Sequence, residues 1–204
     1  SAWTIRHLAL AHFAISDLDN KKFYHFERLN RAALNLAGAN TSKLEVWNGD
    51  WKAVADEAGG HHLSASASDH GRPAVITLAL RPLQAPIIHG ENGVSQKGNT
   101  PGNASHYYSF SRLVTNGTLE LGDEKLRVEG LSWMDHEFGT SFLESEQVGW
   151  DWFSLQLRDR EIMLFQLRNR DQSVDKNSSG TIIFPDGRTQ HLRASDIRLI
   201  PGKT

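Results

Sequence analysis

The residues of this chain whose types could support chemistry gather between positions 106 and 168. The densest run is Asp135-His136-Glu137, which follows Trp133 and precedes the aromatic pair Trp150 and Trp152. Carboxyl and imidazole groups can exchange protons near neutral pH, and indole rings can wall an apolar pocket. A buried carboxyl group costs free energy unless it is protonated or paired, so this mixture of residues needs an explanation.

Alternation along β-strands sorts these side chains by face, because successive residues of a strand point to opposite sides. In residues 131–138 the side chains of Trp133, Asp135 and Glu137 share one face, and His136 points the other way. Three further predicted strands offer polar and aromatic faces of their own. If the faces converge, they line a pocket. The members expected from these strands are His106, Tyr108, Trp150, Trp152, Gln156 and Gln166.

Each member also has an ordinary structural explanation, and these alternatives stay open at the level of sequence. The two tryptophans could belong to the core and its rim. Asp135 could pair with Arg112 or cap a turn. His136 could be a hydrogen-bonded structural histidine, and Tyr107-Tyr108 could be ordinary strand residues.

Several other chemistries lack their required residues. The chain has no cysteine, which excludes disulfides and thiolate metal sites. The run Asp135-His136-Glu137 lacks the second histidine that a helical zinc motif places four residues further on. No Gly-x-Ser-x-Gly element of a serine hydrolase and no phosphate-binding glycine loop occurs. We therefore expect no metal and no other cofactor.

Composition limits the partners and the number of domains. The 204 residues allow one large β domain or two smaller ones. The formal net charge is −2, which gives no general attraction for nucleic acid, so we expect no nucleic-acid partner. No apolar run approaches the ~20 residues of a membrane helix, and no signal peptide is visible.

Short strand-like segments separated by turn residues recur along the chain, a pattern typical of a β-sandwich or barrel. Asp17 to Asn20 and Asp186-Gly187 predict turns between strands, and Asn116-Gly117 predicts a type I′ hairpin turn. Asn30 to Ala37 has helical spacing and predicts one short helix. The loop over residues 89–105 is long, and loops of that length are often functional.

Five runs of sequence carry a resemblance to a known family. With these runs the chain resembles the AttH-like predicted secreted hydrolases, a group related to the carotenoid 1,2-hydratases (hydroxyneurosporene synthases). The last two of the five are the most specific. The runs are Leu10-Ala11-His12-Phe13-Ala14-Ile15-Ser16-Asp17, Gly93-Val94-Ser95-Gln96-Lys97-Gly98, Gly102-Asn103-Ala104-Ser105-His106-Tyr107-Tyr108-Ser109, Gly130-Leu131-Ser132-Trp133-Met134-Asp135-His136-Glu137-Phe138-Gly139 and Gly149-Trp150-Asp151-Trp152-Phe153.

The resemblance covers nearly the whole chain and implies an all-β fold of two packed lipocalin-like antiparallel units, each a barrel or sandwich. We expect the first unit at 1–114 and the second at 115–204, with the short helix as an addition. The family begins with a Thr-Glu-Trp-Trp-Tyr-type strand and ends with a Tyr-Trp-Glu-Gly-type segment. Because Ser1 to Thr4 run directly into a strand-like stretch, we expect strands of the fold to be missing at both ends.

The resemblance also implies a function. In the hydratase branch an aspartate is thought to protonate an isoprenoid double bond, and Asp135 is the matching position. A carboxyl group in an apolar pocket can stay protonated near neutral pH, and aromatic faces stabilise a carbocation. We therefore expect a hydratase- or hydrolase-type enzyme for an apolar, isoprenoid-like molecule, with Asp135 as the acid. Glu137 and His136 would tune Asp135 or position water.

Two other functions stay open. A lipocalin-like carrier would need the pocket but not the acid, and a hydrolase of esters or amides would use water activated by a carboxylate. The resemblance implies an exported protein, periplasmic or extracellular. Peripheral association with a membrane is compatible with an apolar ligand, and the oligomeric state is left open.

Overall fold

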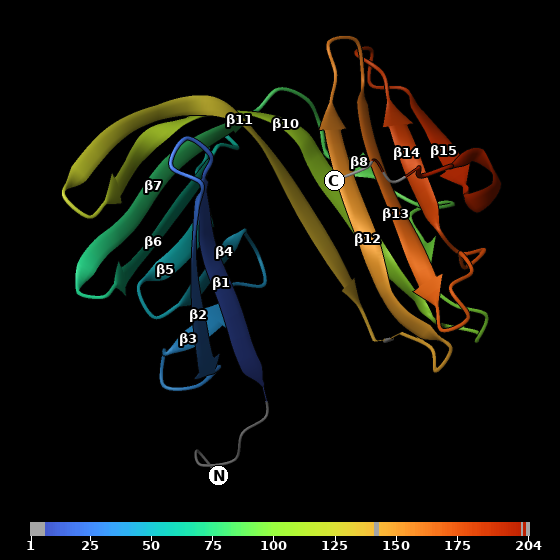
Figure 1. The fold of residues 1–204 in the computed structure, drawn as a ribbon, viewed down its shortest axis with the longest axis horizontal. Coiled ribbons are helices and arrows are strands. Elements are labelled where there is room, and N and C mark those ends of the chain that lie inside the picture. Colours follow the sequence, from blue (N-terminus) through green and yellow to red (C-terminus); the bar gives the residue numbers. More distant parts are fainter. Residues whose placement is uncertain (1–6, 141–142, 201, 203–204) are drawn as a thin grey trace. The chain divides into compact units, whose positions relative to one another are not determined.

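The computed structural model describes residues 7–140, 143–200 and 202, and nearly all of its regular structure is β-strand (Figure 1). The three sheets over these residues are antiparallel, and none closes into a barrel. The all-β fold predicted from the sequence is therefore confirmed. The described chain contains no helix with the length and apolar character needed to cross a membrane. The expectation about Ser1 to Thr4 falls outside the described residues.

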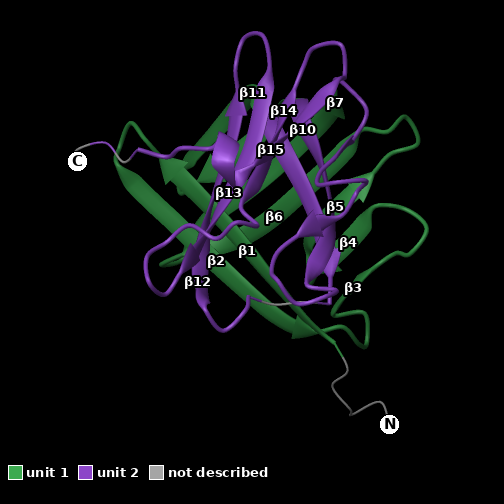
Figure 2. Cartoon of the chain, turned by 90° about the vertical axis from the view of Figure 1, so that its right-hand side faces the viewer, with its two compact units in different colours: residues 1–82, 114–131 green, residues 83–113, 132–204 purple. Residues whose placement is uncertain are grey.

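The chain folds into two compact units whose segments are interleaved in sequence, coloured separately in Figure 2. One unit holds residues 1–82 and 114–131, and the other holds 83–113 and 132–204. Strands β10 (Ala104–Leu121) and β11 (Glu124–Gly139) each contribute one stretch to either unit. The single boundary between residues 114 and 115 that the sequence predicts is not tested by this grouping and stays a prediction.

The first unit combines a two-stranded hairpin with an antiparallel sheet. Residues 114–121 of β10 and 124–131 of β11 extend this sheet. Its core gathers around Phe13, whose ring packs edge-on against Trp51 with Ala65 and Ala74 beside them. Burial of these side chains is the main stabilisation of the unit. The strands are β1 (Leu8–Asp17), β2 (Lys22–Arg31), β3 (Ala37–Ala39), β4 (Glu45–Asn48), β5 (Trp51–Ala55), β6 (His61–Asp69) and β7 (Arg72–Pro82).

The second unit carries a four-stranded sheet in the order β12-β13-β14-β15, visible in orange and red in Figure 1. Residues 104–113 and 132–139 form its other layer, with two short strands paired to β10. The 3-10 helix η1 (Ala194–Asp196) follows the last strand. The strands are β8 (Ile87–Ile88), β9 (Ser95–Gln96), β12 (Gln147–Gln156), β13 (Glu161–Asn169), β14 (Ser179–Ile183) and β15 (Thr189–Arg193).

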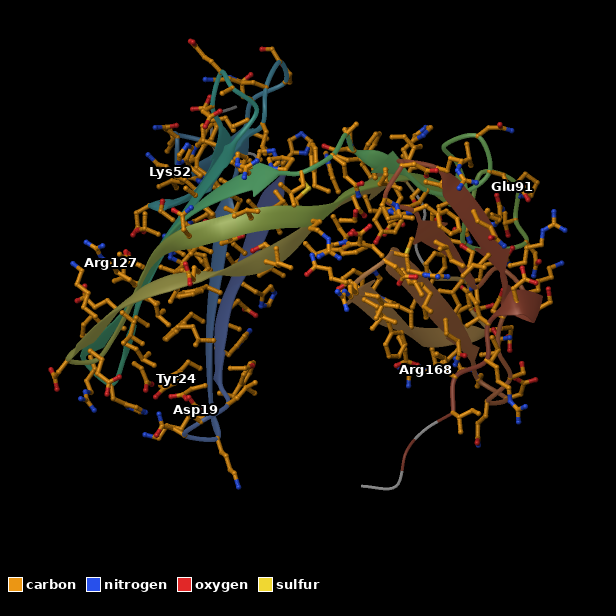
Figure 3. The ribbon with its side chains drawn as sticks, turned by 90° about the horizontal axis from the view of Figure 1, so that it is seen from above. Asp19, Tyr24, Lys52, Glu91, Arg127 and Arg168 are labelled. Atoms are coloured by element: carbon orange, nitrogen blue, oxygen red, sulfur yellow. The ribbon has the colours of Figure 1, made fainter. Side chains whose placement is uncertain are left out.

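Strand β13 shows why the core of the second unit lies on one face of its four-stranded sheet. Met163, Phe165 and Leu167 alternate along it, and all three are buried. Arg168 lies on the opposite, exposed face, where it pairs with Asp151 of β12, and it is labelled in Figure 3. This alternation directs the apolar side chains toward β10, where they cluster with Tyr107.

The predicted helix at Asn30 to Ala37 is wrong. Strand β2 continues to Arg31, and β3 begins at Ala37. Between them Leu34 and Asn35 have φ values of 54° and 58°, which lie outside the helical region. Pairing with β1 uses the backbone of the first residues of the segment, so the remainder forms a tight turn. The turns predicted at Asp17 to Asn20 and Asp186-Gly187 are confirmed.

The predicted hairpin turn at Asn116-Gly117 is also wrong, because β10 runs through both residues to Leu121. A type I′ turn requires positive φ at both positions, and neither residue has it. Gly117 is instead needed for a close backbone approach. A Cβ atom there would lie 2.0 Å from the carbonyl oxygen of Thr77.

Replacing Gly117 by alanine is therefore expected to lower the free energy of unfolding by about 1–3 kcal/mol, because the strands must separate. Gly130 is a matched control on β11, since a Cβ atom there meets nothing within 4 Å. The Gly130→Ala variant should be neutral or slightly more stable. Urea denaturation of both variants measures the difference, and equal midpoints would contradict the close approach at Gly117.

Candidate functional site

A cavity of about 630 Å³ lies in the second unit, and all of its lining residues belong to that unit. Most of the lining is aromatic or aliphatic. One lysine, one glutamate, one serine and one tyrosine interrupt the apolar wall. Pockets of this size and character suit small apolar ligands with a few polar groups. The lining residues are Lys97, Ser105, Tyr107, Glu137, Phe138, Gly139, Leu143, Trp150, Trp152, Phe165 and Leu167.

Asp135 lies directly behind this wall. The indole Nε1–H of Trp133 donates to Asp135 Oδ1 over 2.8 Å, and the hydroxyl of Ser109 donates to the same oxygen. Asp135 is not itself a lining residue, but it lies close enough to Tyr107 for its charge to raise the pKa of the tyrosine. Tyr107, and not the carboxyl group itself, is therefore the residue in contact with the cavity.

The Tyr107 hydroxyl is the polar group that joins Asp135 to the cavity. The ring is almost fully buried, and the indole Nε1–H of Trp152 donates to its oxygen over 2.9 Å. Burial, and next the negative charge of Asp135, raise the pKa of Tyr107 well above its ordinary value. The hydroxyl consequently keeps its proton throughout the physiological range.

A second polar feature of the wall is the ion pair between Lys97 and Glu137. Lys97 Nζ lies 2.7 Å from Glu137 Oε1, and the Ser105 hydroxyl donates to the same oxygen over 2.5 Å. The ammonium group also lies 3.9 Å from the ring centroid of Phe165, a cation–π contact. Burial lowers the pKa of Lys97, while the bond to Glu137 opposes that shift.

A buried histidine is joined to Asp135 through Ser109. His89 is 1% exposed, and its Nε2 lies 2.7 Å from Ser109 Oγ while its Nδ1 lies 2.9 Å from Thr181 Oγ1. Burial, with a smaller contribution from Lys97, lowers the pKa of His89 to about 4. The ring is therefore neutral at pH 7, with one nitrogen donating and the other accepting.

The hydrogen-bond partners assign the tautomer of His89. The Ser109 hydroxyl has one proton, which it donates to Asp135. Ser109 Oγ must then accept from His89 Nε2–H, and Nδ1 accepts from the Thr181 hydroxyl. Four side chains thus form one directed chain that ends on Asp135.

The structure brings together five of the residues expected from the sequence. Trp133, Asp135 and Glu137 share one face of β11, as strand alternation predicts. Trp150 and Trp152 line the cavity, and the rings of Trp133 and Trp152 meet edge-to-face with centroids 6.4 Å apart. The predicted face of β11 and the two tryptophans of β12 therefore converge.

Three expected residues lie on the opposite face. His136 Nδ1 lies 2.9 Å from the Tyr108 hydroxyl, and the His106 ring packs on Phe138. His106 and Tyr108, expected as ligand-binding residues, do not line the cavity; on β10 Tyr107 lines it and Ser109 donates to Asp135. Alternation fixes which residues share a face but not which face of a neighbouring strand they meet.

Two expected glutamines do not line the cavity. The amide of Gln156 donates to the backbone carbonyls of Ser111 and Ser132 over 2.8 and 3.0 Å, so it joins strands. Gln166 alternates with the cavity residues Phe165 and Leu167, so its side chain is directed to the other face of β13.

The alternative that Asp135 pairs with Arg112 is wrong. Arg112 Nε instead donates to Glu161 Oε1 over 2.5 Å. Among the described residues, no three His, Asp or Glu side chains gather closely enough to hold a metal ion.

Among the polar residues of this site, the sequence did not single out His89, Lys97, Ser105, Ser109 and Thr181. Lys97 belongs to the run Gly93–Gly98, whose only signal in the sequence is its resemblance to the family. His89 is preceded by two isoleucines and followed by glycine, a weak signal of burial. Its bond to Thr181 joins residues 92 positions apart, which strand patterns along the chain cannot predict.

Comparison with known proteins identifies the family of this chain. A family model described as AttH-like matches residues 1–204. The crystal structure of a Nitrosomonas europaea protein assigned as an AttH superimposes with a TM-score of 0.86 and 32% sequence identity, over 96% of this chain and 59% of that one. No curated protein matches the chain.

Kievitone hydratase from Nectria haematococca superimposes with a TM-score of 0.69 and 15% identity, over 90% of this chain and 55% of that one. At that identity the likeness concerns the fold alone. The chain therefore spans less than two thirds of the length of either solved structure. Because the family model covers every residue, this chain belongs to the AttH-like family.

Proposed function

We propose that this protein binds an apolar, isoprenoid-like molecule in the cavity of the second unit and adds water to one of its double bonds. One observation carries the proposal: Tyr107 lines an aromatic cavity, and Asp135 lies close enough behind it for its charge to act on the tyrosine hydroxyl. A likeness in fold to a protein named as a hydratase is consistent with this reading.

The first chemical step is protonation of the double bond. Asp135 in its protonated form passes its proton to the Tyr107 oxygen as the tyrosine O–H proton moves to an alkene carbon. A C–H bond forms from the π electron pair, and the neighbouring carbon becomes a cation. Asp135 is left as a carboxylate that Trp133 and Ser109 stabilise through Oδ1. The faces of Trp152 and Phe165 can stabilise the cation.

Water then completes the addition. Its oxygen forms the C–O bond, and the oxonium ion loses one proton. Glu137 is the carboxylate on the cavity wall that can accept this proton, and Lys97 holds it in place. His136 takes no part in this scheme, since it contacts Tyr108 on the other face.

A carrier of apolar molecules is the second candidate. It is favoured by the position of Asp135, which does not itself line the cavity. A carrier would use the aromatic wall for binding and the hydrogen-bonded groups behind it for stability. Binding alone does not separate the two candidates, whereas loss of turnover on changing Asp135 does.

Binding can be tested with farnesol as the probe and the full-length protein. Leu143 lines the cavity and is 40% exposed, so tryptophan at that position should fill the cavity without unfolding the protein. We expect the Leu143→Trp variant to bind farnesol at least tenfold more weakly than the wild type, measured by native mass spectrometry.

Leu157 provides the matched control, because it is 43% exposed and lies outside the lining. The Leu157→Trp variant should bind farnesol like the wild type. Equal binding by both variants would locate the ligand elsewhere, and a wild type that binds no farnesol would count against an isoprenoid ligand.

A further inference from the structure

The far end of the hydrogen-bonded chain behind Asp135 lies beside a residue that lines a second pocket. Thr181 is the far member of the chain, and β14 places it in register with His191 of β15. The Nδ1 atom of His191 is buried and has no hydrogen-bond partner among the described residues. The charge of His191 also helps to lower the pKa of His89, after burial and Lys97.

His191 lines a pocket of about 450 Å³ that differs in character from the apolar cavity. Its wall is mainly polar and charged. Glu91, labelled in Figure 3, belongs to it and pairs with Arg193 over 3.4 Å. Such a wall suits water and small polar species rather than an apolar ligand. The lining residues are Gly90, Glu91, Asn92, Val94, Gln96, Lys176, Asn177, Ser178, Ser179, His191 and Arg193.

We propose that Thr181, His89 and Ser109 form a proton relay. The relay returns a proton to Asp135 from the side of this polar pocket while an apolar ligand fills the cavity. The role rests on the proposed hydration, which leaves Asp135 without its proton in each turnover. The relay itself is a property of the described side chains and can be tested without a substrate.

The protons balance along the relay. A hydronium ion supplied from the polar pocket gives a proton to Thr181 Oγ1 and is left as water, while the original Thr181 proton moves to His89 Nδ1. The Nε2 proton of His89 moves to Ser109 Oγ, and the original Ser109 proton moves to Asp135. Each hydroxyl ends with one proton, His89 changes tautomer, and Asp135 is protonated. Rotation of the hydroxyls and exchange at the ring restore the starting state.

The surroundings of His89 keep the ring in the form that a relay needs. A neutral imidazole has one donor and one acceptor nitrogen, whereas the cation has two donors and stops the chain. Lys97 and His191 disfavour the cation, Glu137 favours it, and burial is the largest effect. The Tyr107 ring packs against the His89 ring, with the ring centroids 4.6 Å apart.

Nitrogen-15 NMR of histidine-labelled full-length protein tests the geometry without a substrate. We expect His89 at pH 7 to be the neutral Nε2–H tautomer. The Ser109→Ala variant, which removes the acceptor of that proton, should change the tautomer ratio. A doubly protonated ring, or an Nδ1–H tautomer in the wild type, would overturn the relay.

Turnover tests the role. The Thr181→Val variant keeps the shape of the side chain but removes the hydroxyl at the far end of the relay. It leaves the hydrogen bonds of Asp135 unchanged. We expect kcat to fall tenfold or more with KM unchanged, and the acid limb of the pH profile to shift. Thr189 is exposed on the next strand, so Thr189→Val is the matched control and should behave like the wild type.

The outcomes separate the relay from the proposed function. If changing Asp135 abolishes turnover while Thr181→Val behaves like Thr189→Val, the relay is wrong and the hydration proposal stands. If the wild type hydrates no isoprenoid alkene, the hydration proposal fails, and the NMR result still decides whether the directed chain exists.

Discussion

The Asp135→Asn variant of the full-length protein is expected to lose between about 10²- and 10⁴-fold in kcat for hydration of an isoprenoid alkene. Asparagine has nearly the same shape as aspartate but carries no acidic proton. Both donors, Trp133 and Ser109, are directed at Oδ1, which the asparagine carbonyl oxygen can replace. The fold should therefore be retained, and the formation of the alcohol product measures the loss.

Two further variants sharpen this prediction. Asp151 pairs with exposed Arg168 on the outer face of β12 and β13, so Asp151→Asn should leave turnover unchanged. Tyr107→Phe keeps the ring but removes the hydroxyl that connects Asp135 to the cavity, and its turnover should fall like that of Asp135→Asn. Undiminished turnover by Asp135→Asn would exclude the acid role and favour the carrier. Loss in Asp135→Asn alone would mean that Asp135 reaches the ligand without Tyr107.

The sequence predicted the strand content because alternation is a local property. In β11 the alternating Trp133, Asp135 and Glu137 could be assigned to one face without any knowledge of neighbouring strands. The same local signals failed at Leu34, where the backbone has positive φ, and at Gly117, whose glycine serves a contact with Thr77. A glycine needed for a turn and one needed for close packing look alike in a sequence.

The site was predicted less completely than the fold, because it depends on how strands meet. Tyr107 and Tyr108 are adjacent tyrosines, and only the pairing of β10 with its neighbours decides which of them faces Asp135. His89 and Thr181 are far apart in sequence and meet only in the folded unit. Small hydroxyl residues such as Ser109 carry no distinctive pattern, although here one of them orients the carboxyl group.

The stability of the protein is expected to fall between pH 6.5 and pH 4 because of His89. Its pKa is about 4 in the folded protein, against an ordinary value of 6.5. Between these values the unfolded chain binds a proton at His89 and the folded chain does not, so lowering the pH favours unfolding. This difference in pKa lowers the free energy of unfolding by about 3 kcal/mol. The loss is absent above pH 7 and complete near pH 4. Chemical denaturation at a series of pH values measures it.

The His89→Gln variant isolates this effect, since glutamine does not titrate and the carboxyl groups that titrate below pH 5 remain in both proteins. Its free energy of unfolding should be lower than that of the wild type at pH 7, because the hydrogen bonds to Ser109 and Thr181 are disturbed. The two proteins should then converge as the pH falls to 4. His70 is 95% exposed, so His70→Gln should give a curve parallel to the wild type. Parallel curves for His89→Gln would mean that the ring is free to take up a proton in the folded state, which is incompatible with a neutral link between Thr181 and Ser109.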